Sequence, residues 1–330
     1  VRMLEERMAA TEGTEDAFAT ASGMAAVNGA LVSLLKAGDH VVAARQLFGS
    51  CLYILNNVLG RYGVEVTLVD GTNLAEWEAA VRPGTKAVFF ESVSNPTLEV
   101  MDIAGIARIA HRVGALVVVD NVFATPLESR AVALGADAVI YSTTKHVDGQ
   151  GRCLGGMILG SKEFIRKTVE PYLKHTGGAM SPFNAWVMLK GIETLDLRVR
   201  AAADSARAIA EAVQGHGKLA DVIYPGLADH AQHALAARQM PNGGTLLALD
   251  LKGGKEAAFR FLNALKIFTI TNNLGDSKSL VTHPATTTHS SLTDEARAVA
   301  GIGPGLVRVS IGLEDTQDLI EDVMKALEAA

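Results

Sequence analysis

The chain has 330 residues, of which 48% are hydrophobic and 20% charged, and its formal net charge is −6 at pH 7. This length allows about two globular domains. Because no run of Lys or Arg and no apolar stretch of roughly 18 residues occurs, the sequence predicts neither a nucleic-acid-binding face nor a membrane span. The cysteines, Cys51 and Cys153, form no CxxC pair, so we expect no disulfide scaffold, no thiolate metal site and a cytoplasmic location.

The N-terminal half alternates between predicted helices and buried strands. An amphipathic helix is already in progress at residues 2–8, which predicts a missing segment upstream of Val1. Strands typical of a mostly parallel sheet, apolar on both faces and separated by helices, are indicated across this half. The expected helices are 22–35, 74–81, 103–113 and 127–134, and the expected strands are 41–42, 64–69, 87–90, 116–119 and 138–141. The predicted fold class is α/β.

A second, smaller domain is expected in the C-terminal half. Ser181 and Pro182 are typical of an N-cap and a first helical residue, and they predict a long helix that runs on to Val213. After Gly215 the pattern indicates an α+β domain, with strands at 245–251, 267–271 and 306–311 and helices at 257–265 and 315–327. The predicted domains are residues 1–195 and, with the linking helix, residues 196–330.

Two strand ends carry residues that point to chemistry. Asp120 ends a buried strand, at the place where open α/β sheets bind ligands. About 25 residues later another strand leads into Ser142, two threonines and Lys145. Taken alone, Asp120 is explained as a helix cap and Lys145 as a surface lysine. Together they match pyridoxal phosphate (PLP) chemistry, which needs an amine for a Schiff base and a carboxylate that keeps the pyridine nitrogen protonated.

A helix N-terminus suits the phosphate of such a cofactor, since its free N–H groups favour an anion. Ser22, Gly23 and Met24 open the helix expected at 22–35, and Gly23 allows close approach of the backbone. An ordinary capped helix would have the same sequence. The segment therefore supports a phosphate site only in combination with Lys145 and Asp120.

The order of several motifs resembles that of the cystathionine γ-synthase-like PLP enzymes, the Cys/Met-metabolism branch of fold type I. The resemblance covers almost the whole chain. Within the family, residues 145–152 and 271–276 are most similar to the O-succinylhomoserine sulfhydrylases. The matching motifs are Ser-Gly-Met at 22–24, Ser-Asn-Pro-Thr at 94–97, Val-Asp-Asn at 119–121, Ser-Thr-Thr-Lys at 142–145, Met-Ser-Pro-Phe at 180–183, Gly-Ile-Glu-Thr-Leu at 191–195, and residues 279–285 and 306–315.

The resemblance implies a role in cofactor binding for several positions. Lys145 holds PLP as a Schiff base and moves protons, and Asp120 pairs with the pyridinium nitrogen. Phe48 matches the position that stacks on the ring, which is usually a tyrosine in this family. The loss of that hydroxyl leaves more of the proton transfer to Lys145. The implied phosphate-binding residues are Gly23, Met24, Ser142 and Thr144, with Ser22 beside them.

The resemblance also implies a substrate site and an assembly. Arg308 grips the substrate α-carboxylate with two parallel hydrogen bonds, and Asn95 and Ser279 lie beside that carboxylate and the cofactor. No metal is implied. In this family the active sites lie at a dimer interface, and two dimers often pair, so the resemblance implies a homotetramer that is a dimer of dimers. In family members, a tyrosine and an arginine from an upstream segment bind the neighbouring subunit's PLP phosphate. If the protein begins at Val1, we expect weak cofactor binding and low activity.

The implied reaction is γ-replacement on an O-acylated homoserine in methionine biosynthesis. O-succinylhomoserine and sulfide, or another small thiol, give homocysteine and succinate. The alternatives within the family are cystathionine γ-synthase, O-acetylhomoserine sulfhydrylase and a methionine or cystathionine γ-lyase. Outside it, an NAD-dependent dehydrogenase lacks its GxGxxG motif, and a metal hydrolase on His283 and His289 lacks an HExxH helix. A non-catalytic scaffold is the alternative if no cofactor binds.

Overall fold

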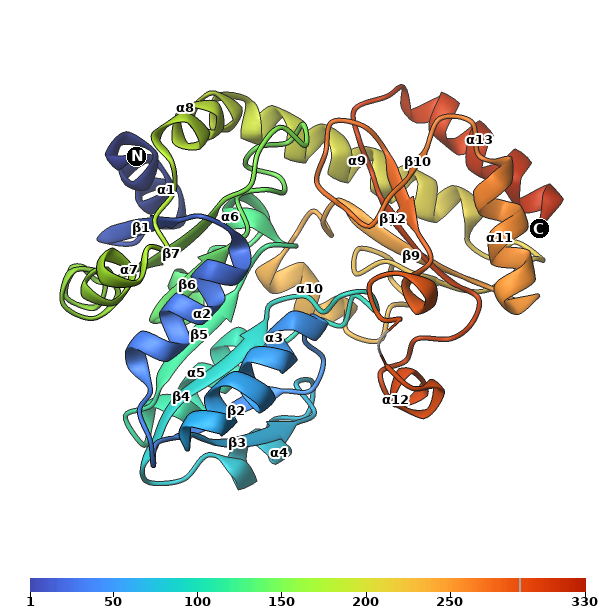
Figure 1. Ribbon diagram of the computed structural model, residues 1–330. Helices are drawn as coiled ribbons and strands as arrows, with labels where there is room; N and C mark the ends of the chain where they lie inside the picture. Colours follow the sequence, from blue (N-terminus) through green and yellow to red (C-terminus); the bar gives the residue numbers. More distant parts are fainter. Residues whose placement is uncertain (291) are drawn as a thin grey trace. The chain divides into compact units, whose positions relative to one another are not determined.

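The computed structural model describes residues 1–290 and 292–330, which divide into two units, each with its own sheet (Figure 1). Most of unit 1 precedes unit 2 in the sequence, but two short loops that interrupt unit 1 belong to unit 2. Unit 1 consists of Val1–Ser94, Val100–Asp148 and Arg152–Glu193, and unit 2 of Asn95–Glu99, Gly149–Gly151 and Thr194–Ala330.

Unit 1 is built on a seven-stranded sheet with the strand order β1-β7-β6-β5-β4-β2-β3. Strands β2 to β6 run parallel to one another, as predicted, while β7 is antiparallel to both β1 and β6. At the edge of the sheet, β3 has one buried residue, Val69, so it is not buried on both faces as expected. The strands are β1 (Asp16–Thr20), β2 (His40–Ala44), β3 (Glu65–Val69), β4 (Thr85–Glu91), β5 (Leu116–Asp120), β6 (Ala138–Tyr141) and β7 (Gly156–Gly160). The predicted α/β fold with a mostly parallel sheet is confirmed.

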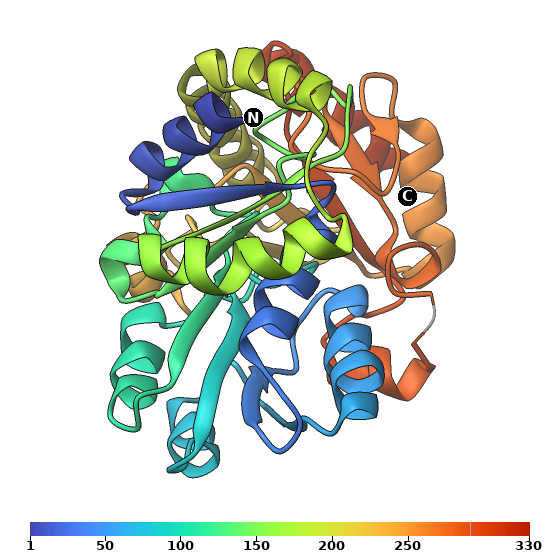
Figure 2. The ribbon, with the colours of Figure 1, turned by 60° about the vertical axis from the view of Figure 1, so that its left-hand side comes forward.

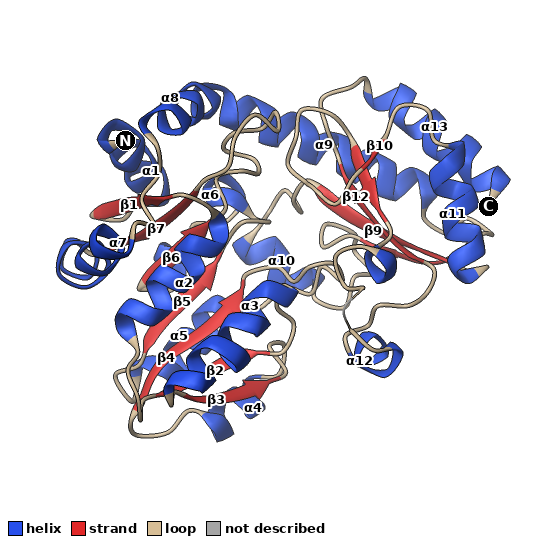
Figure 3. Ribbon diagram, in the orientation of Figure 1, coloured by secondary structure: helices blue, strands red, loops and turns tan. Residues whose placement is uncertain are grey.

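Helices pack on this sheet (Figure 3). Helix α2 lies against β6 and β7, α4 against β3, and α5 against β5. Figure 2 shows β1 between α1 and the helical segment that ends with α7. The helices of unit 1 are α1 (Arg2–Glu12), α2 (Gly23–Leu34), α3 (Gly49–Tyr53), α4 (Leu74–Ala80), α5 (Ile103–His111), α6 (Thr125–Glu128), α7 (Glu170–Thr176) and α8 (Pro182–Gly191), with further helical turns at Ile54–Leu59, Gly60–Tyr62, Ala131–Leu134 and Phe164–Val169.

The long helix predicted from Ser181 to Val213 is wrong. Its start is as expected, because the Ser181 hydroxyl oxygen accepts the Asn184 N–H and a proline follows it. The helix stops at Gly191, a 3-10 turn occupies Ile192–Thr194, and α9 (Leu195–Val213) then begins. Glycine disfavours helix, and a Cβ at Gly191 would lie 2.4 Å from the Val147 carbonyl oxygen. The helix expected at 127–134 is likewise two short pieces.

Unit 2 contains a five-stranded, mostly antiparallel sheet with the order β10-β11-β12-β9-β8. The hydrophobic core of this unit joins residues of α9, α11 and α13 to the buried side chains of the sheet. The elements are β8 (Leu219–Ile223), α10 (His233–Gln239), β9 (Leu246–Leu251), α11 (Gly254–Ala264), β10 (Thr269–Ile270), β11 (Leu280–Thr282), a 3-10 turn (Pro284–Thr286), α12 (Asp294–Val299), β12 (Leu306–Ser310) and α13 (Thr316–Ala329). The smaller α+β domain is confirmed. In the described part of the chain, no helix combines the length and apolar character needed to span a bilayer.

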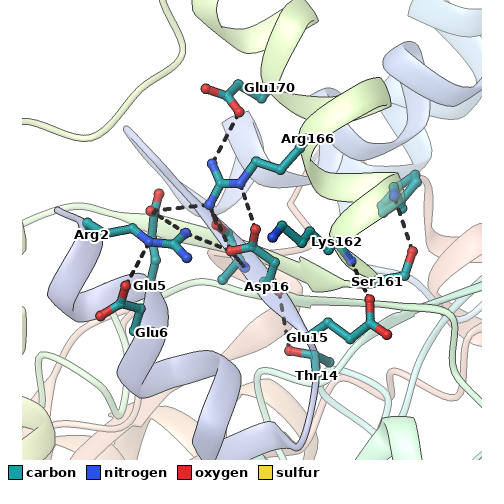
Figure 4. A network of polar contacts seen from close by, with 12 residues as sticks. Arg2, Glu5, Glu6, Thr14, Glu15, Asp16, Ser161, Lys162, Arg166 and Glu170 are labelled. Carbon is teal, nitrogen blue, oxygen red and sulfur yellow. Dashed lines mark hydrogen bonds and ion pairs between the residues drawn. The ribbon is translucent and has the colours of Figure 1, made fainter.

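An ion-pair network fixes β1 in unit 1 (Figure 4). The buried carboxylate of Asp16 accepts hydrogen bonds from Arg166 Nε at 2.6 Å, from Arg166 Nη2 at 2.7 Å and from Arg2 Nη1 at 2.7 Å. Burial acts to raise the pKa of Asp16, but the hydrogen bonds from Arg166 and Arg2 outweigh it, and the pKa lies well below its usual range. Asp16 is therefore ionised throughout the neutral range.

We expect Asp16→Asn to lower the free energy of unfolding by about 1–3 kcal/mol at pH 7, because charged donors lose their partner. The folded-state pKa is below the unfolded value of about 3.9, so the stabilisation is present above that pH and is lost as the pH falls. Urea unfolding should show the difference between variant and wild type shrinking below about pH 4. Glu163→Gln, which removes an exposed pair with Lys167, is the control. Equal stability of Asp16→Asn and wild type at pH 7 would contradict this role.

Candidate active site

Asp120, Ser142 and Lys145 lie at the carboxyl edge of the unit 1 sheet. Asp120 is the last residue of β5 and pairs in register with Glu91 of β4 and Ile140 of β6. Ser142 follows β6, and its carbonyl oxygen accepts the Lys145 N–H at 3.1 Å, which closes a tight turn. Parallel strands end at the same edge of a sheet. The structure therefore brings the predicted acid and lysine to one edge.

The raised pKa of the Asp120 carboxyl group is consistent with a site for a cationic ligand. Burial raises the pKa of this carboxyl group to about 7, against the lowering effect of a hydrogen bond from the Val122 N–H at 3.1 Å. A cation against Asp120, such as a protonated pyridine nitrogen, favours the ionised carboxylate. The acid thus fits the pyridinium end of PLP.

The N-terminus of α2 lies against the turn that leads to Lys145. Ser22 is the N-cap, and its hydroxyl oxygen accepts the Ala25 N–H at 3.1 Å. A Cβ on Gly23 would lie 2.7 Å from the Cβ of Ser142, so only glycine allows this approach. Free N–H groups at a helix start beside a serine hydroxyl form an anion site. The arrangement fits a phosphate.

The remaining predicted cofactor residues are placed as follows. The Thr144 hydroxyl donates to the Gly155 carbonyl at 3.1 Å and accepts the Gly155 N–H at 3.0 Å, so it fixes the loop after Lys145. Met24 lies half-buried in the first turn of α2 and packs against the core of unit 1. Phe48, also half-buried, is the N-cap of α3.

Glu91 and Cys51 are neighbours of Asp120 that the sequence alone does not single out. Their ligand atoms and that of Asp120 all lie within 4.8 Å of one another. Burial and then the charges of Asp120 and Glu91 raise the pKa of the Cys51 thiol, which is therefore neutral. Oε1 of Glu91 accepts the Phe48 N–H at 2.6 Å. One feature of the sequence could have pointed to Glu91: like Asp120, it is a polar residue that ends a buried parallel strand.

Arg308 is the centre of a second polar group, inside unit 2. It lies on β12 between Thr282 of β11 and Ala248 of β9, and it is 2% exposed. Its Nη1 donates to the side-chain oxygen of Asn95 at 2.9 Å, and its Nη2 donates to the carbonyl oxygens of residues 272 and 273 at 3.1 and 3.0 Å. The predicted pair Arg308 and Asn95 is therefore in direct contact.

The guanidinium of Arg308 retains capacity for an anion. Its Nε is buried and has no hydrogen-bond partner among the described residues. Burial lowers the pKa of Arg308 to about 10, so the group is still charged near neutral pH. A buried charge is costly unless it is paired, and no aspartate or glutamate of the described ranges contributes to this shift. A carboxylate ligand fits this donor set.

Two further residues of unit 2, His289 and Ser279, were named from the sequence. Burial and then the charge of Arg308 lower the pKa of His289 to about 4, and its ring donates to the Asn95 backbone, so His289 is a neutral support for Asn95. The Ser279 hydroxyl donates to Glu314 at 2.8 Å and accepts the Gly312 N–H at 2.9 Å. Both of these hydrogen-bond partners are residues other than Arg308 and Asn95. From the sequence, His289 was considered only as a metal ligand. Its contact with Asn95 could not be predicted, because the two residues are far apart in the chain.

The fold is that of the fold type I PLP-dependent enzymes. A sequence model of the family described as "Cys/Met metabolism PLP-dependent enzyme" matches residues 1–328, and the chain belongs to this family. Its cofactor is pyridoxal phosphate.

Named relatives are similar over almost the whole chain. An O-succinylhomoserine sulfhydrylase of Mycobacterium tuberculosis is 54% identical over 99% of this chain and 82% of its own length. An L-methionine gamma-lyase of Pseudomonas putida is 43% identical over 100% of this chain and 83% of its own. A solved putative O-acetylhomoserine (thiol)-lyase of Campylobacter jejuni, which contains N'-pyridoxyl-lysine-5'-monophosphate, has a TM-score of 0.95 and 33% identity, covering 99% of this chain and 86% of that one.

We expect Gly23→Ala to weaken PLP binding while the protein stays folded. The added methyl group overlaps Ser142, and such overpacking costs about 1–3 kcal/mol, or roughly 5- to 150-fold in Kd. Titration of the cofactor-free protein with PLP, followed by visible absorbance, measures the change. Gly217→Ala, where a Cβ would meet nothing within 4 Å, is the control. Wild-type affinity in Gly23→Ala would contradict a phosphate site at the start of α2.

Proposed function

We propose that this protein catalyses γ-replacement on an O-acylated homoserine. O-succinylhomoserine and sulfide, or another small thiol, give homocysteine and succinate, a carbon–sulfur bond-forming step of methionine biosynthesis. The observation that carries this choice of substrate is the 54% identity to the O-succinylhomoserine sulfhydrylase of Mycobacterium tuberculosis over 99% of the chain. Arg308, which is buried and whose Nε has no hydrogen-bond partner among the described residues, supports a substrate with a carboxylate.

The residues of unit 1 are proposed to hold and tune the cofactor. PLP, when bound, supplies an electron sink for the substrate carbon that loses its proton. Lys145 carries the cofactor through a Schiff base, and its amine removes and returns protons during the reaction. Asp120 keeps the pyridine nitrogen protonated, and the ring of Phe48 covers one face of the cofactor. The residues assigned to the phosphate are Ser22, Gly23, Met24, Ser142 and Thr144.

The residues of unit 2 are proposed to bind the amino-acid end of the substrate. Arg308 offers its Nε and one terminal nitrogen to the α-carboxylate in a bidentate pair. Asn95 orients the guanidinium through its side-chain oxygen, and neutral His289 supports the Asn95 backbone. Ser279 supports the same sheet by holding Gly312. We assign residues 1–195 to a cofactor-binding domain and residues 196–330 to a second domain.

We propose a cytoplasmic homotetramer, a dimer of dimers, with small molecules as its only other ligands. The exposed rings of Phe183 and Trp186 on α8, whose centroids are 6.0 Å apart, support an interface, because aromatic side chains are enriched in such contacts. Light scattering should give a mass four times the 34.7 kDa of the chain. A monomer in the presence of PLP would contradict this assembly.

The reaction is tested by pairing two donors with two acceptors. We expect sulfide to convert O-succinylhomoserine to homocysteine and succinate faster than it converts O-acetylhomoserine to homocysteine and acetate. Consumption of the ester with cysteine alone would identify a cystathionine γ-synthase instead. The 43% identity to an L-methionine gamma-lyase favours one other candidate, and release of ammonia and a 2-oxo acid from methionine at a comparable rate would support that alternative.

A further inference from the structure

Glu91 is a buried carboxylate to which the proposed reaction assigns no role. It is 5% exposed, ends β4 and lies beside Asp120 in the register of the sheet. Its Oε1 accepts the Phe48 N–H at 2.6 Å. Glu91 thus joins the end of β4, next to Asp120 on β5, to the start of α3.

Phe48 needs support of this kind. Phenylalanine has no polar side-chain atom, so no hydrogen bond can orient its ring directly. Its side chain is half-buried and packs against the core of unit 1 on one side only. The backbone of Phe48 is the second point of attachment: its carbonyl oxygen accepts the Cys51 N–H at 2.8 Å in the first turn of α3, and its N–H donates to Glu91.

We propose that Glu91 is a positioning residue that holds the ring of Phe48 against the cofactor by binding the Phe48 N–H. The inference rests on the proposed function, in which Phe48 covers one face of the PLP ring. What Glu91 must supply is a hydrogen-bond acceptor at this point. Its negative charge is not required for the role.

Two substitutions at Glu91 separate the acceptor from the charge. Glu91→Gln keeps a side-chain oxygen that accepts the Phe48 N–H and loses the charge, whereas Glu91→Ala loses both. PLP affinity is measured by titration, and the orientation of the bound ring by circular dichroism at the visible absorption band. We expect Glu91→Ala to raise Kd by roughly 2- to 10-fold, the effect of losing one hydrogen bond, and to diminish the visible circular dichroism. Glu91→Gln should retain both properties.

A double-mutant cycle with Phe48→Ala tests whether Glu91 acts through the ring. If it does, Glu91→Ala should change Kd little once the ring is absent, because the two effects are coupled. Additive losses, equal losses in Glu91→Gln and Glu91→Ala, or no loss in Glu91→Ala would each overturn the proposal. Thermal unfolding of the cofactor-free variants serves as the control for folding. A wild type that forms no borohydride-trapped adduct on Lys145 would overturn the proposed function instead.

Discussion

Lys145→Ala should bind PLP without a covalent link and should lose nearly all activity. The amine is assigned both the covalent attachment and the proton transfers, and removing a positioned acid–base group alone costs roughly 10²- to 10⁴-fold. We expect kcat/KM to fall by roughly 10⁴-fold or more, since both roles are lost together. The visible absorbance should shift from that of a Schiff base to that of the free aldehyde.

Borohydride reduction followed by peptide mapping gives an independent measurement of the same assignment. In wild type the label should be found on Lys145, and in Lys145→Ala no lysine should carry it. Lys167→Ala removes a lysine whose side chain is 75% exposed and should behave as wild type. A label on another lysine of the wild type, or near-normal turnover in Lys145→Ala, would contradict the assignment.

Arg308→Ala should lower kcat/KM for the amino-acid substrate by roughly 30- to 5,000-fold, since losing one partner of a buried charge pair costs about 2–5 kcal/mol. PLP binding should change little, because the residues assigned to the cofactor lie in unit 1. Steady-state kinetics on the PLP-loaded variant measure the first effect and PLP titration the second.

Arg308→Lys adds a pH signature to this prediction. Burial lowers the pKa of a lysine toward neutrality, whereas burial lowers the pKa of Arg308 only to about 10. The KM of Arg308→Lys should therefore rise with pH between about 7 and 9, while the wild-type arginine stays charged over that range. Arg45→Lys, at an exposed ion pair with Glu76, is the control. A pH-independent KM near the wild-type value in Arg308→Lys would exclude Arg308 from carboxylate binding.

The local pattern of the sequence was enough to predict the five parallel strands of unit 1, β2 to β6, and the acid and lysine at the carboxyl edge of the sheet. Buried parallel strands are apolar on both faces, and a polar residue that ends such a run is easy to recognise. Strands β1 and β7 gave no such signal, because β1 contains two alanines and a single β-branched residue, and β7 begins and ends with glycine. The close approach of the Val147 carbonyl to Gly191, at the end of α8, leaves no room for a Cβ, and helical periodicity does not reveal such a contact.

Contacts between distant residues account for what the sequence could not predict in the site. The bond from Glu91 to Phe48 spans 43 residues, and that from Arg308 to Asn95 spans 213. No spacing rule connects positions so far apart. The roles expected for Asn95 and Arg308 came from a resemblance to known enzymes, whereas Glu91 and His289 became visible only when the folded backbone placed them.

The discontinuous make-up of unit 2 limits how this gene can be recombined. A crossover near codon 194 would exchange the bulk of unit 2 but leave Asn95–Glu99 and Gly149–Gly151 with the old sequence. Arg308 from one parent would then meet Asn95 from the other. A chimera of two relatives should preserve the arginine–asparagine contact only if both parents have the same sequence in the asparagine loop. Otherwise that loop has to be exchanged together with the rest of unit 2.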